Sequence, residues 1–180
     1  MKNKALLNTI IAVTVLIVVG LFGDSFFGGT DSPNPPASSI LGEQSLAKVT
    51  SIVDGDTIKV QQNGVVNTVR LIGINTPETK DPRKEVECFG AEATLHLKNL
   101  IENKSVQLES DSTQGDTDRY GRLLRYVFLD DGTNINLKMI EDGYAYEYTY
   151  SKPYYYQNDF IEAEEYAREN QLGFWGGTCE

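Results

Sequence analysis

Apolar and polar residues alternate along residues 47–74 in a way that predicts three consecutive β-strands. The first run covers residues 47–53 and ends at an Asp-Gly-Asp turn, after which residues 57–60 resume the alternation. The Asn63-Gly64 pair is typical of a tight hairpin turn, and a third run follows over residues 65–74. Strands joined by such short turns predict an antiparallel meander.

The pattern changes to a helical period in three later segments. Apolar side chains recur on one face over residues 85–104, 136–142 and 160–171. Gly143 and Gly173 follow the second and third of these segments, as glycine often does at a helix end. Three amphipathic helices are therefore expected.

Two further alternating runs, residues 105–109 and 123–129, predict a fourth and a fifth strand. Five strands, with helices after the third and the fifth, predict an α+β fold that is mainly β. We expect a small closed barrel with helical caps, of which the five-stranded oligonucleotide-binding (OB) fold is one kind.

A long apolar segment precedes the barrel. Residues 5–23 carry no charge and follow Lys2 and Lys4. The segment has 19 residues. A membrane-spanning helix needs about 20 apolar residues, whereas the apolar region of a signal peptide usually has about 7–15. The lysines favour a cytoplasmic N-terminus and an exported body, and a buried helix is the third alternative.

These patterns divide the chain into four parts. Residues 1–23 are expected to be a membrane anchor or a cleaved signal peptide, and residues 24–45, rich in Gly, Ser, Pro and Asn, a flexible linker. Residues 46–176 form the predicted barrel domain, and residues 177–180 a short tail. The domain is then anchored outside the membrane or secreted.

The charge of the chain is uneven. A formal net charge of -10 is unusual for a protein that binds nucleic acid, but residues 141–180 carry nine acidic against two basic residues. Residues 44–140 carry 14 acidic and 12 basic residues. A local positive site between Arg70 and Arg125 is compatible with this distribution.

The chain has two cysteines, Cys88 and Cys179, and one histidine, His96. In an exported protein an even cysteine count indicates a disulfide, here tying the C-terminus to the region before the first helix. Two unpaired thiols are the alternative.

Polar side chains collect where the predicted strands end. Arg70 and Arg122 lie on or beside strands, and five oxygen-bearing residues stand at strand ends: Asp54, Asp56, Asn75, Thr76 and Glu78. Oxygen ligands that combine carboxylate, amide and carbonyl suit Ca²⁺. Two arginines can pair with phosphodiester oxygens, and a carboxylate such as Glu78 can position or deprotonate an attacking water. The set predicts metal-assisted phosphodiester hydrolysis.

The combination and its order strongly resemble the staphylococcal nuclease (thermonuclease) family over about residues 46–176. The matching segments are residues 52–60 (IVDGDTIKV), 69–79 (VRLIGINTPET), 89–93 (FGAEA), 118–126 (DRYGRLLRY) and 172–175 (LGFW).

The resemblance implies an OB-fold barrel and Ca²⁺-dependent cleavage of DNA and RNA to 3′-phosphate products by a monomeric enzyme. It also implies the following roles: Arg70 and Arg122 as phosphate-binding catalytic arginines, Glu78 as catalytic carboxylate, Asp56 and the Thr76 carbonyl as calcium ligands, Asp54 near the metal, and Arg119 and Tyr120 at the terminal phosphate of the nucleotide.

One position departs from the family pattern. Asn75 stands where the best-known member has an aspartate ligand. An amide oxygen can still coordinate Ca²⁺, but one negative charge is missing, so weaker Ca²⁺ binding is expected.

The segment after the second helix is rich in tyrosine. Tyr144, Tyr146, Tyr148 and Tyr150 alternate and could form a base-stacking platform, or simply pack on the barrel. An alternative function for the whole domain is a non-catalytic oligonucleotide-binding module. The joint presence of Arg70, Glu78 and Arg122 favours the enzyme.

Overall fold

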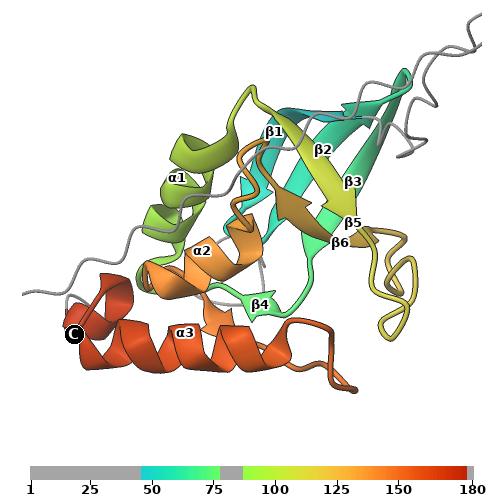
Figure 1. Ribbon diagram of the computed structural model, residues 1–180. Coiled ribbons are helices and arrows are strands. Elements are labelled where there is room, and N and C mark those ends of the chain that lie inside the picture. The colour runs from blue at the N-terminus through green and yellow to red at the C-terminus, as the bar shows by residue number, and fades with distance from the viewer. Residues whose placement is uncertain (1–45, 78–86, 178–180) are drawn as a thin grey trace, which may run out of the picture. The chain divides into compact units, whose positions relative to one another are not determined.

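Five strands close into a barrel in the order β1-β2-β3-β6-β5, which confirms the predicted architecture (Figure 1). The computed structural model describes residues 46–77 and 87–177, all within one compact unit of the chain. The barrel strands are β1 (Ala47–Asp54), β2 (Thr57–Gln62), β3 (Val65–Leu71), β5 (Ser105–Glu109) and β6 (Leu123–Phe128).

Strand pairing brings the two predicted arginines to adjacent strands. The meander β1-β2-β3 is antiparallel, with Thr57 on β2 opposite Arg70 on β3. The next pair, β3 and β6, is parallel, and Arg70 lies opposite Leu124. Strand β5 then pairs antiparallel with both β6 and β1 and closes the barrel. Arg122, directly before β6, is thereby placed beside Arg70.

Three helices cover the barrel, as predicted, but their ends differ from the predicted ones. They are α1 (Gly90–Ile101), α2 (Ile135–Glu141) and α3 (Gln157–Glu169), followed by a short 3₁₀ helix, η1 (Gly173–Gly176). Helix α1 starts later than expected because Phe89 has a left-handed backbone with a φ of 72°. Helix α2 is capped by Asn134, whose side chain accepts a hydrogen bond from the Leu137 N–H at 3.2 Å.

The core is formed by inward-facing strand residues and one face of each helix. Its largest fully buried side chains include Ile58, Leu71, Leu97, Met139 and Phe160. Fully burying an apolar side chain of this size contributes about 1.5–3 kcal/mol relative to exposure. These contacts hold the barrel end that carries the polar residues.

Buried Asn136 of α2 ties that barrel end together. Its amide donates to the carbonyl oxygens of Ile72, at 2.9 Å, and Arg125, at 3.2 Å, while its oxygen accepts from the Val127 N–H at 3.0 Å. Because all these groups are shielded from water, losing the amide would leave several of them unsatisfied. Asn136 thus fixes the chain directly after β3 against β6.

The predicted third strand is interrupted by a turn at Ile72 and Gly73. Gly73 has a φ of 77°, and a Cβ there would lie 2.6 Å from the Tyr154 ring and 2.8 Å from the Phe160 ring. The chain resumes as β4 (Ile74–Asn75), which pairs with β7 (Tyr146–Glu147) in a small sheet that was not predicted. The turn places Asn75 and Thr76 over the end of the barrel.

Several predictions fall on other parts of the chain. The anchor or signal peptide of residues 1–23, the linker of residues 24–45 and the end of the tail, residues 178–180, lie outside the described residues. Within residues 46–77 and 87–177, no helix combines the length and the apolar character needed to cross a membrane.

Candidate functional site

A cavity of about 570 Å³ opens beside the end of the barrel. Eight of the predicted site residues line it: Asp54, Asp56, Arg70, Asn75, Thr76, Arg119, Tyr120 and Arg122. They come from the β1–β2 turn, from β3 and β4, and from the loop before β6. The ninth, Glu78, lies outside the described residues.

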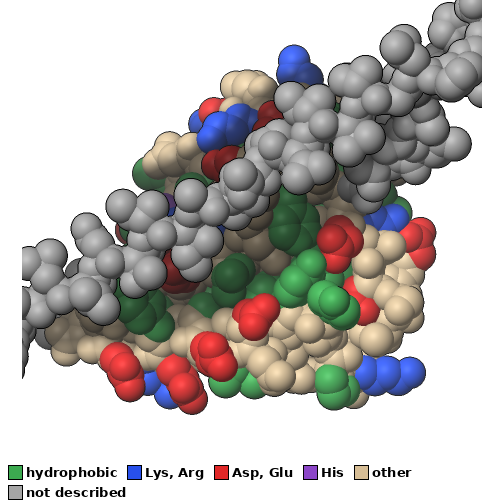
Figure 2. All heavy atoms as spheres, viewed as in Figure 1, with side chains coloured by type: hydrophobic (Ala, Val, Ile, Leu, Met, Phe, Trp, Pro, Cys, Tyr) green, Lys and Arg blue, Asp and Glu red, His purple; other side chains and the backbone are tan. Residues whose placement is uncertain are grey.

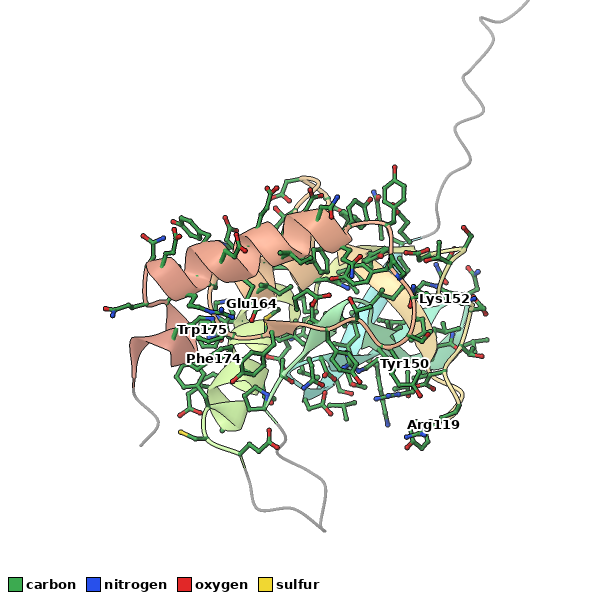
Figure 3. All side chains as sticks on the ribbon, turned by 90° about the horizontal axis from the view of Figure 1, so that it is seen from below. Arg119, Tyr150, Lys152, Glu164, Phe174 and Trp175 are labelled. Atoms are coloured by element: carbon green, nitrogen blue, oxygen red, sulfur yellow. The ribbon has the colours of Figure 1, made fainter. Side chains whose placement is uncertain are left out.

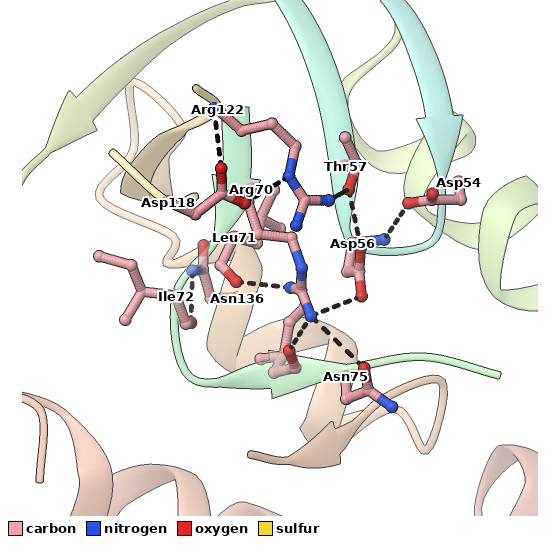
Figure 4. Close-up of polar contacts among 11 residues, drawn as sticks. Asp54, Asp56, Thr57, Arg70, Leu71, Ile72, Asn75, Asp118, Arg122 and Asn136 are labelled. Carbon is pink, nitrogen blue, oxygen red and sulfur yellow. Dashed lines mark hydrogen bonds and ion pairs between the residues drawn. The ribbon is translucent and has the colours of Figure 1, made fainter. Parts of the chain in front are cut away.

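The inner wall of the cavity consists of Asp56, Arg70 and Asn75 (Figure 4). Arg70 Nη2 lies 2.8 Å from Asp56 Oδ2 and 3.4 Å from Asn75 Oδ1. The same guanidinium donates to the carbonyl oxygens of Leu71, at 2.8 Å, and Ile74, at 2.9 Å. The side chain of Arg70 is only 14% exposed. Arg70 is therefore held in one position by the backbone as well as by a carboxylate.

The outer wall consists of Asp118, Arg119, Tyr120 and Arg122, in the loop before β6. Asp118 Oδ1 accepts from the backbone N–H groups of Tyr120 and Arg122, each at 2.9 Å, and Oδ2 accepts from Arg122 Nε at 2.7 Å. Burial alone would raise the pKa of Asp118, but these hydrogen bonds and the Arg122 charge lower it. One carboxylate thus shapes the turn and orients its arginine.

Thr57 connects the two walls. Its hydroxyl donates to Asp56 Oδ1 at 2.8 Å and accepts from Arg122 Nη1 at 3.3 Å (Figure 4). A continuous polar path therefore runs from Arg122 through Thr57 and Asp56 to Arg70. Both guanidinium groups face the same cavity and are fixed relative to each other.

The β1–β2 turn brings a second carboxylate to this end of the cavity. The pKa of Asp54 is raised to about 6, mainly by burial and in addition by the negative charge of the nearby Asp56 carboxylate. The glycine between them is required by close packing, because a Cβ on Gly55 would lie 2.8 Å from Thr76 Oγ1. The turn and the segment after β4 are therefore in direct contact.

The chemistry of these donors fits a hard cation. Asp54, Asp56, Asn75 and Thr76 supply only oxygen donors, which suits Ca²⁺. Asp54 and Asp56 repel each other, and a bound cation would reduce this repulsion. Within the described ranges, however, no three His, Cys, Asp or Glu side chains gather in a way that could hold a metal. The four oxygen-bearing residues therefore include only two carboxylates, because Asn75 supplies an amide where an acidic residue would supply a third.

The tyrosines of residues 144–156 divide into two groups. Tyr148 and Tyr150 line the cavity and are exposed, Tyr150 to 71%. Tyr154 is buried and donates to Glu147 Oε1 at 3.0 Å. Tyr144 stacks on His96, with ring centroids 3.9 Å apart, and Tyr146 lies against Phe174 at 4.3 Å. Tyr154 also lines the cavity, but it is only 5% exposed, so Tyr148 and Tyr150 offer the larger ring surfaces to a ligand there.

The acidic residues of the last helix lie away from the cavity. Acidic side chains gather along α3, at the lower edge of Figure 2. This helix contributes no residue to the cavity lining. The negative charge of the chain is therefore compatible with a cavity that contains arginines.

The predicted disulfide is described at one end only. Cys88 is not a free thiol and is disulfide-bonded. Cys179 lies outside the described residues, so the pairing of Cys88 with Cys179 stays a prediction.

Two residues at the centre of the site, Thr57 and Asp118, were not predicted to belong to it. Thr57 follows Asp56 directly and Asp118 precedes Arg122 by four residues, and both lie within the matched segments. The signal that could have identified Asp118 is its spacing. An aspartate at the start of a tight turn commonly accepts backbone N–H groups two residues further on.

Comparisons with known proteins agree with this geometry. Residues 68–177 match the family described as "Staphylococcal nuclease homologue". The chain is 42% identical over 125 residues to the SPbeta prophage-derived endonuclease YokF of Bacillus subtilis, which is 68% of this chain and 41% of that protein. It is 33% identical over 174 residues to the thermonuclease of Staphylococcus hyicus, which is 96% of this chain and 98% of that protein. Endonuclease YncB of Bacillus subtilis is 38% identical over 137 residues, covering 74% of this chain and 64% of that protein.

Proposed function

The chain belongs to the staphylococcal nuclease family, and we infer that it hydrolyses phosphodiester bonds of nucleic acids. The observation that carries this inference is the pair of guanidinium groups, Arg70 and Arg122, joined through Asp56 and Thr57 beside one cavity. Two arginines held at a fixed separation match the charge and the oxygen geometry of a phosphodiester.

The two arginines stabilise the charge that develops on phosphorus during attack. Groups already oriented toward that charge need no reorganisation as it forms, which is the main source of such catalysis. Asp56 and the carbonyl oxygens of Leu71 and Ile74 orient Arg70, whereas Asp118 orients Arg122. Glu78 is proposed to position and deprotonate the attacking water.

We propose that Ca²⁺ is the cofactor. Asp56, Asn75 and the Thr76 carbonyl would hold it, with Asp54 close by, and the ion would add positive charge at the phosphate oxygens. The products are proposed to be DNA and RNA fragments that end in a 3′-phosphate.

The proposed location is outside the cell membrane, either anchored or secreted. Its support is the uncharged stretch of residues 5–23 after Lys2 and Lys4. Immunoblotting of the cytosol, membrane and medium fractions tests it, and full-length protein confined to the cytosol would exclude export.

The activity is tested by incubating the purified protein with plasmid DNA and with RNA, in Ca²⁺ or in chelator. We expect both substrates to be cut only with Ca²⁺, and mass spectrometry of the products from a defined oligonucleotide should show 3′-phosphate ends. The variant Glu78→Gln should bind but not cut. Binding without hydrolysis by the natural protein would instead support the oligonucleotide-binding alternative.

A further inference from the structure

We propose that Lys152 binds a backbone phosphate beyond the nucleotide held at Arg70 and Arg122, so that the site accepts a single strand several nucleotides long. This inference rests on the proposed function, because it extends the same substrate site. Lys152 lines the same cavity as the two arginines, but it comes from the segment between β7 and α3.

The ammonium group of Lys152 is available to a ligand. Lys152 is exposed, and within the described residues its side chain makes no ion pair and no hydrogen bond. Arg119 of the outer wall is likewise exposed, and its one described side-chain contact is with the Tyr120 ring, 4.8 Å away. By contrast, Lys98, Lys138 and Arg168 all have acidic partners on their own helices. Lys152 and Arg119 thus have no acidic partner among the described residues, and both line the cavity.

Hydrogen bonds hold the loop of Lys152 against the loop that carries Arg119. Gln114 Nε2 donates to the carbonyl oxygens of Lys152, at 3.2 Å, and Pro153, at 3.1 Å. Asp111 makes a second tie, since its Oδ2 accepts from the Tyr155 N–H and its Oδ1 from the Thr113 N–H, both at 2.8 Å. The backbone beneath Lys152 is therefore fixed, although its side chain is free to follow a strand.

Exposed aromatic rings line the same cavity as the two cations. Arg119, Tyr150 and Lys152 lie along one edge of the molecule in Figure 3, far from Phe174 and Trp175 at the opposite edge, and all three of the former line the cavity. A groove that combines unpaired cations with exposed rings is typical of single-strand binding, because unpaired bases can stack on the rings. The predicted path runs from the arginine pair, past Tyr148 and Tyr150, to Lys152.

The size of the effect follows from counterion release. For a single strand, the logarithm of affinity falls with the logarithm of salt concentration with a slope of about -0.7 per phosphate contact. Loss of one contact therefore weakens binding about fivefold in 0.1 M salt. Because the contact is to the backbone, the loss should be similar for different base sequences.

The test compares Lys152→Gln with Lys59→Gln in the full chain. Lys59 on β2 is also an exposed lysine without an ion pair among the described residues, but it does not line the cavity. Fluorescence anisotropy with labelled oligothymidylates, in chelator to prevent hydrolysis, measures affinity across a salt series for a dodecamer and a dimer. For Lys152→Gln we expect the slope to shrink by about 0.7 and the dodecamer affinity to fall about fivefold, with a smaller loss for the dimer. Lys59→Gln should match the natural protein.

The outcomes separate this inference from the proposed function. An unchanged slope and affinity in Lys152→Gln, or an equal loss in Lys59→Gln, would overturn the role of Lys152. A natural protein that binds the dodecamer through Lys152 but cuts no nucleic acid with Ca²⁺ would overturn the proposed hydrolysis and leave the phosphate subsite standing.

Discussion

The inner and outer walls of the cavity each present an arginine, but they hold it in different ways. On the inner wall, two backbone carbonyls and the Asp56 carboxylate bind Arg70, whose side chain is 14% exposed. On the outer wall, one carboxylate and one hydroxyl bind Arg122, whose side chain is 30% exposed.

This difference indicates that Arg70 contributes to the stability of the fold as well as to the site, whereas Arg122 contributes chiefly to the site. Arg70 is part of the barrel end, because the groups that bind it belong to the β1–β2 turn, to β3 and to β4. Arg122 stands on a turn outside the barrel, where Asp118 orients it without burying it. We therefore expect substitutions on the inner wall to affect both folding and activity, and substitutions on the outer wall to affect activity much more than folding.

The largest expected effect is on catalysis by Arg122→Gln. Removing one oriented donor of charge stabilisation should lower kcat by about a thousandfold, while the free energy of unfolding stays within about 1 kcal/mol because the lost ion pair is partly exposed. Steady-state hydrolysis and urea unfolding measure the two quantities. Arg125→Gln is the matched control: Arg125 lies on β6 and pairs with Asp116 at 2.6 Å, but it does not line the cavity. An equal loss of kcat in the control would remove Arg122 from its proposed role.

Next in size is the stability of Arg70→Gln. The substitution leaves the Asp56 carboxylate and two backbone carbonyls without their common donor, and breaking a buried ion pair in this way costs about 3 kcal/mol of unfolding free energy. Activity should fall as well. Urea unfolding of Arg70→Gln beside Arg122→Gln tests the contrast directly. If both variants lose the same stability, the two walls are not held differently.

A smaller effect is expected for Asp118→Asn. The amide oxygen can still accept the backbone N–H groups of Tyr120 and Arg122, but the charge that orients Arg122 Nε is lost. We expect kcat/KM to fall about tenfold, the equivalent of one hydrogen bond to a charged group, with folding retained.

The same variant should also change the response to acid. The pKa of Asp118 is lowered in the folded protein, so the stability that this carboxylate adds is complete above the pKa of an unfolded aspartate and is lost as the pH falls through its folded pKa. Unfolding curves at several acidic pH values should therefore be less steeply pH-dependent for Asp118→Asn. If Asp118→Asn and the natural protein showed the same pH dependence of unfolding, the Asp118 carboxylate would not stabilise the folded turn through its charge.

The smallest predicted change concerns the metal. Asn75→Asp would restore a negative charge beside Asp56, and Ca²⁺ affinity increases with ligand charge, so the Ca²⁺ concentration for half-maximal activity should fall about fivefold, the equivalent of about 1 kcal/mol. Titration of activity with Ca²⁺ for both proteins measures it. Equal Ca²⁺ concentrations for half-maximal activity would show that the Asn75 amide does not weaken Ca²⁺ binding.

The barrel was predictable because its signals are local. Residues 105–109 alternate between apolar and polar side chains, and β5 spans the same residues. The parallel pairing of β3 with β6 could not be predicted in this way, because no local pattern shows which strands will lie side by side. The two-residue strands β4 and β7 are too short to show a period, and the turn that creates β4 depends on Tyr154 and Phe160 from the far end of the chain.

For the cavity, residue types were more informative than contacts. Matched segments singled out Arg70 and Arg122, because guanidinium groups in strand-like surroundings are unusual. Thr57 and Lys152 received no role because threonine and lysine are common on surfaces. Only the folded chain shows that Thr57 links Arg122 to Asp56, the partner of Arg70, and that Lys152 lines the cavity without a side-chain partner among the described residues.

Parallel pairing of β3 with β6 has a consequence for how the protein becomes active. The contact joins residues distant in sequence, with β4, α1 and β5 between them, and such long-range pairings tend to form slowly during folding. A chain with only the meander formed would have Arg70 without Arg122. The onset of hydrolysis during refolding should then report when β3 pairs with β6 and brings Arg122 beside Arg70.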